Sequence, residues 1–131
     1  MDEERLALLK EMEERLDYRF NNIEWLDRAL THKSFIHQTN TSQKVSNEVL
    51  EFLGDAVLNL VVSHLLLREF PDAQEGTLSM MRSHLVKRSS LAFLFKELRL
   101  EGHLLLGKSE LLDGGMEKTS ILANEYEALI G

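Results

Sequence analysis

The sequence predicts an all-α domain, from its breakers and from the spacing of its apolar residues. One proline and seven glycines interrupt 131 residues, so few positions break a helix. Apolar residues recur mostly at spacings of three and four, the period of a helix face, and the period-two alternation of strands is missing. Helices are expected over residues 3–16, 22–31, 46–69, 75–87, 89–98 and 118 to the end.

The longest expected helix, 46–69, has recognisable boundaries. Ser46 or Asn47 is expected to cap its start, because short polar side chains satisfy the free N–H groups of a first turn. Pro71 closes its far end. The segment Gly107–Thr119 is expected to be the one long polar loop, with a turn at its two adjacent glycines.

Length and composition describe one domain of an ordinary globular protein. The chain is 44% hydrophobic and 28% charged, and no run of about 18 apolar residues is present to cross a membrane. The N-terminus is acidic and unlike a signal peptide, and the absence of cysteine excludes a disulfide scaffold. We therefore expect a soluble protein of the cytoplasm that has no membrane partner.

The overall charge restricts how the chain could bind nucleic acid. Fifteen Lys and Arg against 22 Asp and Glu give a net charge of −7, the wrong sign for gripping phosphates by charge alone. Such a partner would need metal ions, a local basic patch or another domain. The apolar run before Gly131 lacks a finishing polar turn, so we expect the last helix to be interrupted and the chain to be a piece of a longer protein.

Three carboxylates lie in the most apolar segment. Glu48, Glu51 and Asp55 fall at spacings of three and four and share one helix face, while almost every other position from 47 to 62 is apolar. A helix that is apolar all round is usually central in its domain. Glu51 and Asp55 would then lie near the interior, where a carboxylate must be neutralised, paired or bound to a cation. The alternative is a solvated acidic face.

The last helix repeats this pattern, with Asn124 and Glu127 three residues apart among apolar neighbours. No Lys or Arg lies three or four residues from Glu51 or Asp55 to pair with them locally. The two helices could therefore face each other around a hard cation. Oxygen-only ligands favour Mg²⁺, with Mn²⁺ as a substitute, over zinc, and no organic cofactor is expected. A carboxylate-held Mg²⁺ commonly holds a phosphate and activates water, which indicates phosphodiester chemistry.

The same residues resemble a known family. The string NEVLEFLGDAVLNLVV, residues 47–62, resembles the signature helix of the bacterial ribonuclease III endonuclease domain. Four further segments follow the family's order and approximate spacing: ALTHKSF (29–35), EGTLSMMRSHLVKRSSLA (75–92), LLLGKSELLDGG (104–115) and KTSILANEYEALIG (118–131). The resemblance covers essentially residues 1–131 and is far more specific than a single short pattern.

The resemblance implies an all-helical endonuclease domain that works as a homodimer on double-stranded RNA in rRNA and mRNA processing. Each subunit would contain one Mg²⁺-dependent centre and cut one strand, leaving 5′-phosphate and 3′-hydroxyl ends with a short 3′ overhang. By position, the catalytic and metal-binding residues of the family match Glu51, Asp55 and Glu127, and the fourth metal ligand matches Asn124.

Three further positions match the family. Glu48 and Glu75 match additional acidic residues that line its cleavage site, where we expect supporting roles. Phe52 matches the aromatic residue that inserts into a pocket of the partner subunit, so it is the expected dimer contact. The alternative for Phe52 is an ordinary core phenylalanine.

The sequence departs from the family at Asn124, where aspartate is common. The amide offers one neutral carbonyl oxygen, so a charge and some metal affinity are lost. Family members also usually continue with the rest of this helix, another helical segment and, in bacterial forms, a double-stranded RNA-binding domain, none of which lies within residues 1–131. The domain alone is therefore expected to bind RNA weakly.

Several basic residues are candidates for phosphate contacts, with a solvated helix face as the alternative. They are Arg82, His84, Lys87, Arg88, Lys108 and Lys118. His32 and His64 are interpreted as structural. Ser79, Ser83 and Ser89 have no recognisable His and Asp partners, which argues against a hydrolase triad.

Three hypotheses follow. The leading one is a Mg²⁺-dependent endoribonuclease, in which a pair of ions activates water and stabilises the leaving oxygen. The second is a catalytically impaired dimer that binds RNA or protein while Asn124 prevents cutting. The third, a redox carboxylate protein, lacks the Glu-x-x-His pairs of di-iron helices.

Overall fold

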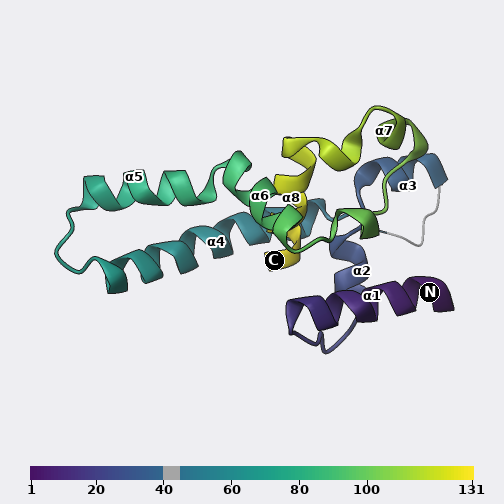
Figure 1. Ribbon diagram of the computed structural model, residues 1–131, viewed down its shortest axis with the longest axis horizontal. Coiled ribbons are helices and arrows are strands. Elements are labelled where there is room, and N and C mark those ends of the chain that lie inside the picture. The colour runs from purple at the N-terminus through teal and green to yellow at the C-terminus, as the bar shows by residue number, and fades with distance from the viewer. Residues whose placement is uncertain (40–44) are drawn as a thin grey trace.

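The computed structural model describes residues 1–39 and 45–131, and this part of the chain is built from helices and turns (Figure 1). The α-helices are α1 (Glu3–Leu16), α2 (Glu24–Ala29), α3 (Lys33–Thr39), α4 (Glu48–Glu69), α5 (Glu75–Val86), α6 (Arg88–Glu97), α7 (Lys108–Leu112) and α8 (Thr119–Ile130). Two 3₁₀ turns, η1 (Glu101–His103) and η2 (Gly115–Glu117), complete them. Within the described residues the only β pairing is an isolated bridge between Thr31 and Leu105, so the predicted all-α fold is confirmed.

Two elements differ from the prediction. The short helix α3 was not expected, because seven residues are too few to show a helical period. The prediction of one long loop at Gly107–Thr119 is wrong, since α7 and η2 occupy most of it. An ion pair of 2.7 Å from Lys118 Nζ to Glu110 Oε1 holds this segment together. Gly114 makes the expected turn, with a left-handed φ of 78° that disfavours any residue with a Cβ.

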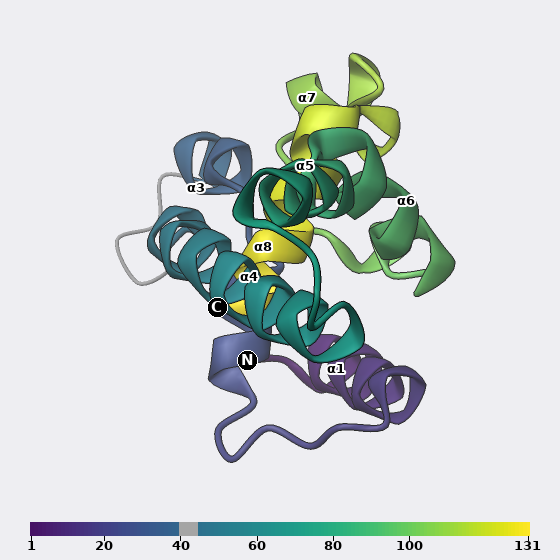
Figure 2. The ribbon, with the colours of Figure 1, turned by 90° about the vertical axis from the view of Figure 1, so that its left-hand side faces the viewer.

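The centre of the domain is α8, which packs against both α4 and α6 (Figure 2). The main core lies mostly on the α1, α2 and α6 sides of it and consists of Leu9, Met12, Leu26, Leu30, Ala92, Phe95, Leu100, Leu104, Leu106, Ile121 and Leu122. The buried guanidinium of Arg5 ties α1 to this core through Asp27 Oδ1 at 2.8 Å and the His103 carbonyl at 2.7 Å.

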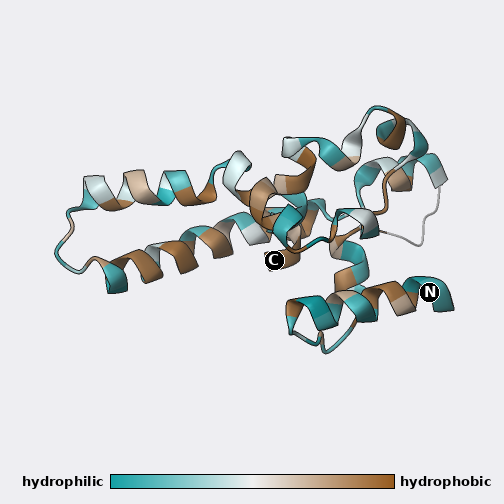
Figure 3. Ribbon diagram, in the orientation of Figure 1, coloured by the Kyte–Doolittle hydropathy of each residue, from teal (hydrophilic) through white to brown (hydrophobic). Residues whose placement is uncertain are grey.

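The expectation that α4 is the central helix is wrong. It buries a single stripe, Leu50, Gly54, Leu58 and Leu66, and its outer half projects with α5 as a hairpin away from the other helices (Figure 1). Apolar colour continues along the rest of α4 (Figure 3), where Phe52 is 79% and Leu60 71% exposed. The carboxylates of α4 therefore lie near the surface.

Hydropathy alone does not decide the surroundings of α4. Among the described helices, α4 is the one that is long and apolar enough to cross a membrane. The expectation that the sequence contains no segment of this kind is therefore wrong. One such helix is weak evidence, because core helices of globular domains pass the same test.

Asn47 occupies the N-cap position of α4 but does not cap it with its side chain. Its Nδ2 atom donates instead to the Ala29 carbonyl at 3.0 Å and to Glu125 Oε1 at 2.6 Å. Ser46 also fails to cap the helix, since its hydroxyl donates to Glu48 Oε1 at 3.3 Å. The predicted start of α4 is thus nearly right, while the predicted capping role is wrong, because a partner from α8 competes for the amide. Pro71 follows the end of the helix as expected.

The backbones of α4 and α8 touch at Gly54. A Cβ atom there would lie 1.6 Å from the Glu127 carbonyl oxygen, a distance that two atoms cannot share. A Cβ at Gly131 would likewise lie 2.1 Å from the Leu50 carbonyl oxygen. The missing side chains let the helices meet, which brings Asp55 and Glu51 alongside Glu127.

Glu125 is completely buried beside this contact. Burial is the main cause that raises its pKa to about 8; the hydrogen bond from Asn47 opposes the shift and the charge of Glu51 adds to it. Its second oxygen, Oε2, has no hydrogen-bond partner in the described part of the chain. The acid is therefore mostly neutral at pH 7.

Gly54→Ala tests the helix contact. The added methyl group meets backbone rather than a side chain that can rotate away, so we expect the free energy of unfolding to fall by about 3 kcal/mol or more. Urea denaturation measures the loss. The matched control is Gly76→Ala in α5, where nothing lies within 4 Å of the added Cβ and where stability should hold or rise slightly. Equal stability of the two variants would contradict the assigned contact.

The Glu125 pKa makes stability depend on pH. The ordinary pKa is 4.5 and the pKa in the folded protein is about 8. At a pH between these two values, the folded protein retains a proton that the unfolded chain has released. The resulting stability is fully present below the ordinary pKa and is lost as pH rises through about 8. Thermal unfolding from about pH 5 to pH 8 should thus show Glu125→Gln losing less stability than the parent, by on the order of 1 kcal/mol per pH unit. The control is Glu97→Gln, at an exposed carboxylate, whose stability should depend on pH as that of the parent does. A Glu125→Gln profile parallel to that of the parent would contradict the raised pKa of Glu125.

Candidate carboxylate site

Asp55 of α4 and Glu127 of α8 form the centre of the candidate site, directly beside the Gly54 contact. Their carboxyl groups lie close enough to interact. Burial is the main cause that raises the Glu127 pKa to about 7, and the charge of Asp55, hydrogen bonding with Asp55 and the charge of Glu51 add to it. Positive charge is favourable beside such a pair of carboxyl groups.

Glu51 extends this pair along α4. Its pKa is raised, first by burial and then by the charge of Glu48, with a smaller contribution from Asp55. The positive charges of Lys33 and Arg88 act in the opposite direction. The carboxylates predicted to share one face of α4 therefore do interact. Their unfavourable charge is only partly compensated by two nearby cations.

Glu51 also lines a polar cavity of about 340 Å³. Its lining residues are His32, Lys33, Asn47, Glu48, Glu51, Glu110, Lys118, Ser120, Ile121 and Asn124. Asn124 thus faces the same space as Glu48 and Glu51. Asp55 and Glu127 do not line this cavity. Glu51 therefore connects the two groups, because it lines the cavity with Asn124 and also interacts with Asp55 and Glu127.

Sequence reasoning missed Lys33 and Glu110 as cavity residues, and it interpreted His32 as structural. The His32 Nδ1 atom accepts a hydrogen bond from the backbone N–H of Ser34 at 3.1 Å, and the Ser34 hydroxyl lies 2.8 Å from the same atom. Burial lowers the His32 pKa, although Glu110 opposes the shift. The imidazole is therefore neutral at pH 7 and is fixed by its own turn. In the sequence, the only indication of this cavity is Lys33, which directly follows His32 in the segment ALTHKSF.

The donor set fits a hard divalent cation. Carboxylate and amide oxygens are the ligands that Mg²⁺ and Mn²⁺ prefer. Burial is the main cause that raises the pKa values of Glu51 and Glu127, and repulsion by neighbouring carboxylates, which a cation would relieve, adds to it. Among the described residues, no three His, Asp or Glu side chains converge closely enough to hold an ion between them as they stand. Cation binding would require these side chains to come closer together.

The structure divides the six basic candidates. Arg88 lies within electrostatic reach of Glu51 and Glu127. Lys118 lines the polar cavity but pairs with Glu110, and Arg82 donates from Nη1 to Ser63 Oγ at 2.9 Å, which ties α5 to α4. The exposed residues His84, Lys87 and Lys108 do not line the polar cavity.

Glu75 and Phe52 lie apart from the cluster. Glu75 begins α5 at the far end of the hairpin (Figure 1), beyond about 20 Å of helix from Asp55 to Glu69, and it accepts a hydrogen bond from Ser79 Oγ at 3.0 Å. A single chain therefore does not bring Glu75 to the other carboxylates. Phe52 is 79% exposed, which excludes the alternative of an ordinary core phenylalanine in this chain.

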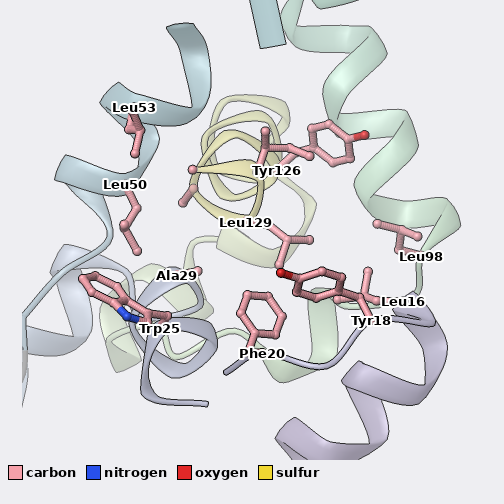
Figure 4. Close-up of a pocket in the computed structure, with 13 residues that line it drawn as sticks. Leu16, Tyr18, Phe20, Trp25, Ala29, Leu50, Leu53, Leu98, Tyr126 and Leu129 are labelled. Carbon is pink, nitrogen blue, oxygen red and sulfur yellow. The ribbon is translucent and has the colours of Figure 1, made fainter. Parts of the chain in front are cut away.

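A larger, apolar cavity lies elsewhere in the described part of the chain. It has a volume of about 830 Å³, and Trp25, Leu50, Leu53, Tyr126 and Leu129 surround it, with Phe20 and Tyr18 at its lower edge (Figure 4). Large apolar pockets are the usual first candidates for a site. This one has no carboxylate or basic side chain among its lining residues, so the smaller polar cavity is the better candidate for chemistry at phosphate.

Comparison with known proteins gives a consistent set of relatives. Residues 22–131 match the Ribonuclease-III-like family model. Ribonuclease 3 of Syntrophobacter fumaroxidans is 47% identical over 93% of this chain and 50% of its own length, and that of Oleidesulfovibrio alaskensis is 44% identical over 95% and 54%. The chain thus spans about half the length of the curated relatives it matches.

Solved structures agree with this result. The nuclease domain of ribonuclease III from Campylobacter jejuni superimposes with a TM-score of 0.84 at 41% identity, over 92% of this chain and 80% of that one. A second structure of that domain gives 0.81 at 42% identity, over 92% and 78%. The first is described as showing structural flexibility in a region involved in dimer formation. By sequence and by fold, this chain belongs to the ribonuclease III-like family.

Proposed function

We propose that this domain is an endoribonuclease that hydrolyses phosphodiester bonds of double-stranded RNA with Mg²⁺. The products would carry 5′-phosphate and 3′-hydroxyl ends, with a short 3′ overhang, and the setting would be RNA processing in the cytoplasm. The observation that carries the proposal is the contact between Asp55 and Glu127, with Glu51 beside it. These are the positions at which family resemblance and local electrostatics agree.

The polar residues of the site would have two roles, holding the ion and reducing charge repulsion. Glu51, Asp55, Glu127 and the Asn124 carbonyl oxygen would hold Mg²⁺ or Mn²⁺. The bound ion would polarise the phosphoryl oxygen and lower the pKa of water. Arg88 would reduce repulsion between the carboxylates and the RNA phosphates.

Dimerisation is part of the proposal. Phe52 and Leu60 leave much of the α4 surface apolar and open to water, which is unusual for a face with no partner. A relative of known structure has a region involved in dimer formation, and this supports a homodimer through α4. Glu75 could then reach a carboxylate cluster only across the two chains, because α4 separates it from its own.

A second candidate function is an RNA- or protein-binding dimer that does not cut. Asn124 favours it, because its amide replaces a charged ligand with a neutral one in the cavity shared with Glu48 and Glu51. The two functions differ only in whether Mg²⁺ produces cleavage.

The deciding experiment compares cleavage of a long perfect RNA duplex by this chain and its Asn124→Asp variant across Mg²⁺ concentrations. We expect both to cut, with the aspartate variant reaching half its maximal rate at lower Mg²⁺, because it adds one negative charge to the site. Asp55→Asn and Glu127→Gln, which keep nearly the same volume, should lower the rate at least about 100-fold.

Each other outcome has a distinct meaning. Cleavage by the aspartate variant alone would support the binding-only function. If neither protein cut the duplex and neither bound Mg²⁺ or Mn²⁺ by calorimetry, the endoribonuclease proposal would be refuted.

The dimer contact is tested with Phe52→Ser. Removing a large, exposed aromatic side chain from the proposed interface should raise the dimer dissociation constant at least about tenfold, as measured by sedimentation equilibrium. The control is Leu112→Ser in α7, where an 88% exposed leucine lies outside α4. A parent that stays monomeric, or a Phe52→Ser variant as dimeric as the control, contradicts the proposed interface.

A further inference from the structure

One buried hydrogen bond connects the two helices that carry the candidate ligands. Asn47 Nδ2 donates to Glu125 Oε1 at 2.6 Å, and both residues are buried, Glu125 completely. Glu125 lies on α8 between Asn124 and Glu127 in the sequence, but its side chain packs into the interior. Neither residue was singled out as a ligand, and no role in the site has been assigned to their contact.

The bond fixes the first turn of α4. Asn47 immediately precedes this helix, and its carbonyl accepts a hydrogen bond from the Glu51 N–H at 2.9 Å. Its own N–H donates to the Thr31 carbonyl at 3.0 Å, and its side chain also reaches the Ala29 carbonyl. Any shift of Asn47 would therefore carry Glu51 with it.

The bond from Asn47 to Glu125 is a directional contact between α8 and the start of α4. The backbones of the two helices also meet at Gly54 and between Leu50 and Gly131. Asn47 and Gly54 lie seven residues apart, or about 10 Å along the α4 axis. The backbone contacts set how closely the helices approach, whereas the hydrogen bond also requires a defined direction between donor and acceptor. This direction matters because Glu51 moves with α4 while Asn124 and Glu127 move with α8.

The bond is a costly way to obtain stability alone. A buried carboxyl group loses its hydration, and Glu125 Oε2 recovers none of it within the described part of the chain. An apolar side chain of similar volume would be as stable there or more so. A hydrogen-bond acceptor at position 125 has a benefit only if the relative orientation of α4 and α8 matters.

From this geometry we infer that Glu125 is a positioning residue, whose hydrogen bond to Asn47 sets the spacing between the α4 and α8 ligands of the carboxylate site. The inference rests on the proposed function, since it assumes that these side chains bind a divalent cation. Glu125 itself touches neither the cation nor RNA.

The test uses two variants of similar volume and measures Mn²⁺ alone, by calorimetry and electron paramagnetic resonance. Glu125→Gln keeps an oxygen that accepts from Asn47, so its Mn²⁺ affinity should stay within about twofold of the parent. Glu125→Met removes the acceptor and should weaken Mn²⁺ binding about tenfold or more, the usual loss for residues that orient ligands. Its melting temperature should remain equal or rise.

The outcomes separate positioning from packing. If Glu125→Met is folded and binds Mn²⁺ as tightly as the parent, or if Glu125→Gln loses as much affinity as Met, the inference is wrong. Should Glu125→Met fail to fold, Asn47→Ala removes the same bond from the other side and should show the same tenfold loss. Parent-like affinity in Asn47→Ala would equally overturn the inference.

A further comparison identifies failure of the underlying proposal. The parent should bind Mn²⁺ and Asp55→Asn should bind it much more weakly. A parent without Mn²⁺ affinity, or an Asp55→Asn variant that binds equally well, would overturn both the carboxylate site and the role of Glu125. Normal parent binding with an unaffected Met variant would overturn the positioning role alone.

Discussion

The close approach of α4 and α8 at Gly54 is the constraint on which the rest of the structure depends. The Glu127 carbonyl occupies the space of a Cβ at Gly54, so the helices meet backbone to backbone. The carboxyl groups of Asp55 and Glu127 are then brought close enough to interact. A glycine that would weaken an ordinary helix here places two carboxyl groups where no pair of larger residues could bring them.

The electrostatics of the site follow from that contact. Carboxyl groups that are close and partly removed from water titrate at higher pH, and two neighbouring cations, Lys33 and Arg88, compensate Glu51 only in part. In a chain of net charge −7, repulsion is reduced further only by protons or by added cations. The acidic composition is unfavourable for direct contact with RNA phosphates, and the proposed divalent cation would compensate for it at the site.

The same arrangement explains the exposed apolar surface. Because α8 occupies the centre, α4 can bury only the stripe around Gly54 and Leu58, and the opposite side with Phe52 remains open. One helix therefore presents two faces of different chemistry. Its acidic face belongs to the candidate site, and its apolar face is suited to a second protein surface.

The sequence by itself determined the helical fold, the shared face of Glu48, Glu51 and Asp55, and the family, because helical period and motif spacing are local properties. The tertiary structure alone decided which surfaces meet. It placed α8 at the centre, separated Glu75 from the cluster and exposed Phe52. It also turned Asn47 from an expected cap into the partner of Glu125, an interaction across 78 residues. No spacing rule predicts such a pair, because its members become neighbours only when two helices cross.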